Sequence, residues 1–133
     1  MKMTIKLLTM LMLTSILVFA SCEDKEEEPA VLPTVTTSDF VAQQNGSGEG
    51  GGNVTADGGA DVTVRGIVIS SKANPTIGDN FKKTTDGAGT GAFTSKLGKG
   101  SLAPGFTYHC RAYATNSVGT TYGADKEFSV PVK

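Results

Sequence analysis

The stretch 102-LAPGFTYHCRAYATNSVG-119 decides the fold. Its triplet His109-Cys110-Arg111 could belong either to an active site or to one strand of a β-sheet. Residues 107–116 are rich in Tyr, Thr and small residues, and a turn-forming NSVG sequence follows them, which predicts a β-strand. Successive side chains of a strand face opposite sides, so His109 and Cys110 cannot hydrogen-bond to each other. His109 is the only histidine in the chain, which leaves Cys110 without a base. We therefore interpret the triplet as part of a strand.

The rest of the chain after the first thirty residues has the same β character. Short runs rich in Val, Thr, Ile, Tyr and Phe alternate with turns built on Gly, Asn, Asp and Pro, and no segment has a sustained helical period. About seven strands at this spacing predict an all-β sandwich over residues 32–133. The expected strands cover residues 34–37, 52–56, 62–71, 81–85, 91–97, 107–116 and 120–130.

The N-terminus has the pattern of a signal peptide. Lys2 and Lys6 are followed by an apolar run, 7–20, that is too short to span a bilayer comfortably, and small residues precede Cys22. The sequence LVFASC resembles the signal of bacterial lipoproteins. This resemblance implies that residues 1–21 are removed and that Cys22 is lipidated and holds the protein to a membrane. The alternative is an ordinary signal peptide cut near residue 20, with Cys22 as a free thiol.

Residues 22–31 form the expected linker. The EDKEEE sequence that follows Cys22 holds five acidic residues and one lysine, a net charge of 1 − 5 = −4, and Pro29 closes it. Such a segment cannot bury apolar surface, so we predict that it is disordered. The tract resembles the acidic export signal of surface-exposed lipoproteins in some Gram-negative bacteria. That resemblance implies an outer-membrane, surface-exposed location, whereas an acidic spacer kept for solubility is the alternative.

The sandwich itself resembles the fibronectin type III-like domains of bacterial surface proteins. The resemblance covers most of residues 32–130 and rests on GNVTADGGADVTVRGIVIS, NPTIGDN and the long stretch from 84 to 123. Leu102, Pro104 and Tyr108 match the spacing of the tyrosine corner of such folds. The resemblance implies that the Tyr108 hydroxyl bonds back to the backbone of the preceding connection and has a structural role.

An inward-facing Tyr108 fixes the orientation of its strand. Cys110, Ala112 and Ala114 then face the core, whereas His109, Arg111 and Tyr113 face outward. Two further expectations concern neighbouring strands. Gly48 and Gly50 stand at inward positions, so we expect the second strand to be weak at its start. Ile67 and Ile69 are expected to form an apolar outer stripe on the third strand.

The sequence favours no chemistry. Residues 29–133 hold nine basic and eight acidic residues, a net charge of 9 − 8 = +1, with no basic stripe for nucleic acid. The glycine-rich loops lack the order and the helix of a phosphate-binding loop. The sequence contains no recognisable motif of paired carboxylates and no metal-ligand spacing. We therefore expect a protein that is not an enzyme and that uses no metal or cofactor.

Two function classes remain for the domain. The first is a lipid-anchored structural or interaction module at the cell surface, accessory to adhesion or polysaccharide capture, whose glycan or protein partner the sequence does not identify. The second is a carbohydrate-binding module that uses outward aromatic residues as stacking platforms. Its candidate contacts are Tyr113, Tyr122 and Phe81, with Arg111 and His109 beside them.

Overall fold

The computed structural model describes residues 28–133, which form nine β-strands and no helix. The expected signal peptide, Cys22 and residues 22–27 of the linker lie outside the described residues. Within the described part, no helix is long and apolar enough to cross a bilayer. The strands are β1 (Thr34–Thr37), β2 (Val41–Ala42), β3 (Gly48–Ala56), β4 (Val64–Ser70), β5 (Lys82–Lys83), β6 (Gly91–Leu97), β7 (Thr107–Thr115), β8 (Thr120–Tyr122) and β9 (Lys126–Ser129).

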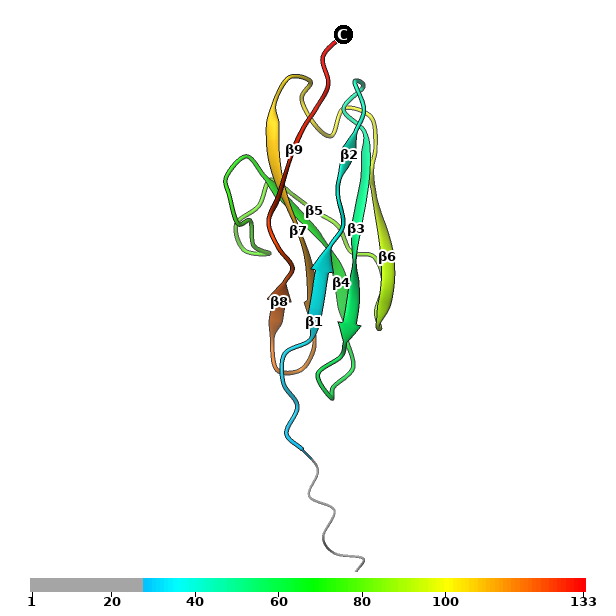
Figure 1. Ribbon diagram of the computed structural model, residues 1–133, viewed down its shortest axis with the longest axis vertical. Coiled ribbons are helices and arrows are strands. Elements are labelled where there is room, and N and C mark those ends of the chain that lie inside the picture. The colour runs from blue at the N-terminus through cyan, green and yellow to red at the C-terminus, as the bar shows by residue number, and fades with distance from the viewer. Residues whose placement is uncertain (1–27) are drawn as a thin grey trace, which may run out of the picture.

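The strands form two antiparallel sheets packed face to face along one long axis (Figure 1). In the first sheet, β1 and β2 both pair with one edge of β3, and β6 pairs with its other edge. In the second sheet, β4 lies between β5 and β7, and β8 and β9 both pair with β7. The prediction of an all-β sandwich is confirmed. The arrangement is compatible with an immunoglobulin-like or fibronectin type III-like domain.

The strands differ from the sequence-based expectation in three places. The short strand β2 was not expected, and β3 begins at Gly48 and not near residue 52. The last expected strand, 120–130, is divided into β8 and β9 by residues 123–125, so that each part pairs with a different stretch of β7.

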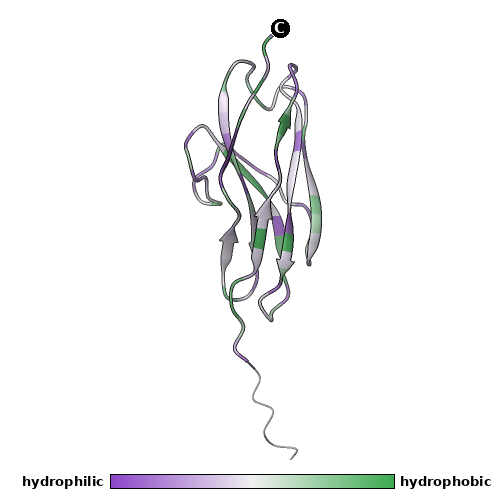
Figure 2. Ribbon diagram, in the orientation of Figure 1, coloured by the Kyte–Doolittle hydropathy of each residue, from purple (hydrophilic) through white to green (hydrophobic). Residues whose placement is uncertain are grey.

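The hydrophobic core lies between the two sheets. Along β7, Tyr108, Cys110, Ala112 and Ala114 are buried in it, as their predicted inward orientation requires. Elsewhere apolar residues are interspersed with polar ones along the strands, as Figure 2 shows. Burial of apolar side chains at alternate positions is what holds two such sheets together.

The expected outer stripe on β4 is wrong. Ile67 lies opposite Ala112 and Ile69 lies opposite Cys110, and both isoleucines belong to the core. Val68 between them has the other orientation, yet it is also fully buried. Because apolar residues cover both faces of β4, alternation along the sequence could not tell which set faces inward.

The glycine-rich start of β3 is a regular part of its sheet. Gly48 pairs with Ala42 on one side and with Leu97 on the other. A side chain at Gly48 would overlap the ring of Phe40, and a Cβ atom at Gly50 would lie 2.6 Å from Phe40 Cδ2. Phe40 comes from the link between β1 and β2 and is 7% exposed. The glycines therefore make room for an aromatic ring from a neighbouring segment.

Two ends of the sandwich, here called poles, lie at opposite ends of the long axis (Figure 1). The N-terminal pole consists of residues 28–33, 57–63 and 116–119, and the C-terminal pole of residues 43–47, 98–106 and 130–133. Hydrogen bonds join the segments of each pole. At the C-terminal pole, Gly100 N donates to Asn45 O over 2.9 Å and Gln44 Nε2 donates to Val132 O over 3.3 Å.

Candidate functional site

The residues of the expected tyrosine corner lie where β6 connects to β7. Ala103 N donates a hydrogen bond of 3.1 Å to the Tyr108 hydroxyl. Leu102 beside it is buried, and Pro104 is exposed at the turn. The hydroxyl thus fixes the connection from inside, where an unpaired amide would be costly.

His109 lies between two carboxylates on the outer face of the second sheet. Its Nδ1 is 2.9 Å from Asp125 Oδ2, and its Nε2 is 3.6 Å from Glu127 Oε2. Asn74 N donates to the same Asp125 oxygen over 3.0 Å. The cluster therefore ties the connection between β4 and β5 to the link between β8 and β9. Within residues 28–133, no group of three or more His, Cys, Asp or Glu residues is placed to hold a metal ion.

Arg111 and Tyr122 form a pair next to this cluster. The Arg111 guanidinium lies 4.6 Å from the centre of the Tyr122 ring, and Arg111 Nε donates to Gly123 O over 3.1 Å. The Tyr122 hydroxyl accepts a hydrogen bond of 3.0 Å from Ile77 N. Both side chains are half-buried and already have partners within the domain, so they contribute chiefly to holding the loop that contains Ile77.

Tyr113 faces outward from the core but is only 2% exposed. Its hydroxyl donates to Thr84 O over 2.5 Å, and burial raises the pKa of this phenol. The segment that contains Thr84 continues from β5 along β4, because Thr84 N donates to Ile67 O. This segment covers the ring, which corrects the expectation of an accessible Tyr113.

Phe81 is separate from the other expected contacts. Its ring is 56% exposed and stacks on Tyr108, with the ring centres 6.0 Å apart. Lys82 Nζ lies 5.4 Å from the centre of the same ring. Since Tyr108 faces the core and Arg111 faces outward, the structure does not bring Phe81 together with His109, Arg111 and Tyr122.

Cys110 has no exposed surface and is a free thiol. Burial, with a smaller contribution from the charge of Asp125, raises the pKa of the Cys110 thiol to about 12. A thiol that stays protonated and covered is a poor nucleophile. Cys110 therefore acts as a small core residue.

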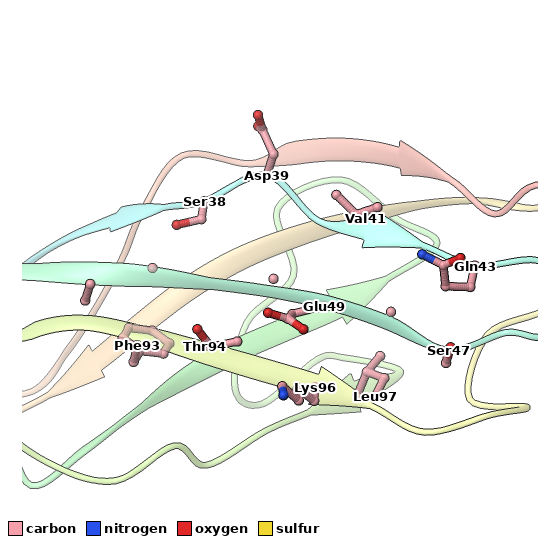
Figure 3. A pocket seen from close by; sticks show the side chains of 14 residues that line it. Ser38, Asp39, Val41, Gln43, Ser47, Glu49, Phe93, Thr94, Lys96 and Leu97 are labelled. Atoms are coloured by element: carbon pink, nitrogen blue, oxygen red, sulfur yellow. The ribbon is translucent and has the colours of Figure 1, made fainter.

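A groove crosses the outer face of the first sheet (Figure 3). It has a volume of about 710 Å³ and runs over the glycine-rich half of β3, between Val41 on β2 and Thr94 and Lys96 on β6. Glu49 projects from its floor. Asp39 at its rim is already paired with Lys126 Nζ at 2.8 Å, which lowers the pKa of Asp39. In the sequence this region is marked only by the GEGGG run at residues 48–52, from which we predicted a weak strand and not a groove.

A second cleft lies at the C-terminal pole and was also missed. It has a volume of about 720 Å³ and lies between the turn that joins β2 to β3 and the segment after β9; its lining residues are Gln43, Gln44, Asn45, Pro131 and Lys133. Asn45 Oδ1 accepts hydrogen bonds from Ser47 N and Ser47 Oγ, at 2.9 and 2.6 Å. The turn is thereby fixed by its own side chains. No single residue type signals this cleft in the sequence, because two segments far apart in the chain create it.

Neither the models of known protein families nor the curated proteins searched contain a match to this sequence. Any function must therefore be argued from the sandwich, its two poles and the N-terminal sequence.

Proposed function

We propose that the protein is a non-enzymatic structural or interaction module, anchored in the bacterial outer membrane by lipid on Cys22 and displayed at the cell surface. The signal-like residues 1–21, Cys22 and the acidic linker support the anchor. The sandwich supports the role of a module, because it is a single β-sandwich with its own core. No cofactor and no nucleic acid take part in this function.

The observation that carries the proposal is the set of hydrogen bonds that fixes Val31, where the linker joins the sandwich. Val31 N donates to Gly58 O over 2.8 Å, and Asn116 Nδ2 donates to Val31 O over 2.7 Å and to Asp57 O over 2.9 Å. Val31, the last residue of the linker, is thus hydrogen-bonded to two other segments of the N-terminal pole. A tether of residues 23–31 reaches at most about 30 Å at about 3.3 Å per residue. In this proposal the membrane lies on the side of the N-terminal pole, and the C-terminal pole lies at the other end of the long axis (Figure 1).

The described side chains also support a role without catalysis. Both ring nitrogens of His109 face carboxylates, and Cys110 is buried on the opposite face of the strand. A nucleophile with its base needs the two groups within hydrogen-bond distance. Surface recognition is therefore the better supported role.

Palmitate labelling tests the anchor. Cells that produce the parent protein, Cys22→Ser or Cys110→Val are labelled with a clickable palmitate and fractionated. We expect label and membrane association in the parent and in Cys110→Val, and we expect Cys22→Ser to be unlabelled and soluble. Two acyl chains stabilise membrane binding by about 0.8 kcal/mol per buried methylene, so the difference should be nearly complete. Label in Cys22→Ser, or none in the parent, would contradict the proposal.

Carbohydrate binding through outward aromatics of the second sheet has less support. Tyr113 is covered, and Arg111 and Tyr122 are bound to each other and to the backbone. Flat sugar rings need an exposed aromatic face with free polar groups beside it. Arg111, Tyr113 and Tyr122 do not offer this combination.

A further inference from the structure

The two poles carry opposite charge. The segments of the N-terminal pole contain Glu28, Asp57 and Asp61 and no lysine or arginine. The segments of the C-terminal pole contain Lys99 and Lys133 and no acidic residue. Four further acidic residues and Lys25 precede this pole in the sequence, at residues 23–27. The molecule therefore presents its basic end away from the tether, and such a field attracts negatively charged partners.

The cleft at the C-terminal pole offers uncommitted polar groups. The carboxamide of Gln43 and the amide nitrogen of Asn45 have no hydrogen-bond partner among the side chains of residues 28–133, whereas Gln44 is held by Val132 O. The Gln43 carboxamide can both donate and accept, and the Asn45 nitrogen can donate, which suits the hydroxyl groups of a sugar. Lys133 adds an ammonium group to the same cleft.

Two exposed apolar residues lie at the same pole, although they do not line the cleft. Phe106 is 61% exposed and Val132 is 64% exposed. Val130 N donates to Phe106 O over 2.9 Å, so the start of β7 lies directly alongside the segment that lines the cleft. Phe106 is more exposed than Phe81, the most exposed of the aromatic residues expected to bind a ligand. An exposed aromatic ring on the segment that pairs with residues 130–133 could contact a further ring of an extended sugar chain whose other rings lie in the cleft.

From these three features we propose that the C-terminal pole binds an anionic polysaccharide built from uronic acids. The sugar rings contact Phe106, their hydroxyl groups pair with Gln43 and Asn45, and their carboxylates pair with Lys99 and Lys133. The outward direction of this pole rests on the proposed lipid anchor, whereas the binding itself does not. A neutral polysaccharide would leave the two lysines unused, and a duplex nucleic acid would need a longer basic surface.

Calorimetry with defined oligosaccharides tests the proposal. The full chain in detergent micelles is titrated with polygalacturonate oligomers and, separately, with neutral dextran oligomers of the same length. We expect binding of polygalacturonate that weakens as salt is raised, because its charged contacts are exposed, and no binding of dextran. No binding of polygalacturonate, or equal binding of dextran, would overturn the proposal.

Matched variants locate the site. Lys99→Gln with Lys133→Gln should lower the affinity at least tenfold, whereas Lys72→Gln with Lys83→Gln removes the same charge elsewhere and should leave it within twofold. Phe106→Ala should also lower the affinity, and Phe81→Ala should not. All four proteins should melt as the parent does. If the control variants lose as much affinity as the variants at the C-terminal pole, or if single-stranded DNA binds as tightly as polygalacturonate, the response to anions is nonspecific and the proposal is overturned.

The same titration separates this proposal from the lipid anchor. Cys22→Ser should bind polygalacturonate as the parent does, because Cys22 lies outside the C-terminal pole. Loss of palmitate label with retained binding supports both proposals. Palmitate label without polygalacturonate binding would retain the anchor and overturn the binding site.

Discussion

The two sheets fill one interior by different means. In the second sheet, β4 and β7 bring their own side chains, and Ile67, Ile69 and Cys110 are fully buried between the sheets. In the first sheet, the start of β3 brings almost none, and Phe40 from the preceding link occupies the space over Gly48 and Gly50. The interior of a protein must be densely packed, but the side chains that fill it need not come from the strand that faces it. Here the ring comes from the link between β1 and β2.

Phe40 also joins the two sheets through other aromatic rings. Its ring centre is 4.4 Å from that of Phe128 on β9, and Phe128 is 5.8 Å from Tyr108 on β7. Phe81 extends the row from Tyr108. Aromatic burial of this kind offsets the conformational entropy that the glycines of β3 lose on folding. The following substitutions test this difference between the sheets.

Phe40→Ala should give the largest loss. Removing a buried phenylalanine leaves a cavity over glycines that have no side chains to close it, so we expect a loss of about 3 to 5 kcal/mol in the free energy of unfolding. Urea denaturation measures it. Phe106→Ala is the control, because that ring is exposed, and its loss should stay within about 0.5 kcal/mol. Similar losses in the two variants would show that Phe40 does not fill the first sheet.

Gly50→Val should have the next largest effect. The new Cβ atom would lie 2.6 Å from Phe40 Cδ2, so the ring must move, and overpacking of this kind costs about 1 to 3 kcal/mol. In a Phe40→Ala background the same substitution has room and should cost less. A double-mutant cycle by urea denaturation measures this coupling. If the losses in the free energy of unfolding are additive, Gly50 is needed for the backbone conformation and not to make room for Phe40.

Tyr108→Phe tests the second sheet at its connection to the first. The variant removes the hydroxyl that accepts a hydrogen bond from Ala103 N, so we expect a loss of about 0.5 to 1.5 kcal/mol with an unchanged outer surface. Thermal melting measures it. A denaturation midpoint equal to that of the parent would remove the tyrosine-corner assignment.

Cys110→Val should have the smallest effect, under about 1 kcal/mol at pH 7, because the two side chains are similar in size. A difference should appear at high pH. The folded-state pKa of Cys110 is raised from 9.0 to about 12, so the thiol's contribution to stability is fully present below pH 9 and is lost as pH rises towards 12. Urea denaturation from pH 7 to 11 should show a steeper decline for the parent than for Cys110→Val. Rapid reaction of the native parent with a thiol reagent at pH 8 would show that Cys110 is not buried.

The sequence predicts the orientation of some strands better than that of others. Along β7, a single anchoring residue and a period of two were sufficient to orient Cys110 and Ala112 correctly. The same logic failed on β4, where both faces are apolar and covered. Phe40 was missed because its partners are glycines, which leave no hydrophobic pattern to match. The clefts were missed because each needs several segments brought together by the fold.

The hydrogen bonds of Val31 at the N-terminal pole have a mechanical consequence. A pull between the linker and the opposite pole acts along the long axis, which is also the direction of the strands (Figure 1). Such a load shears the hydrogen bonds of β1 with β3 together, whereas a pull across the sheet would open them one after another. The hydrogen bonds that Val31 makes with Gly58 O and with Asn116 Nδ2 take the force before it reaches β1. The time for which the domain survives the load is then set by its unfolding rate.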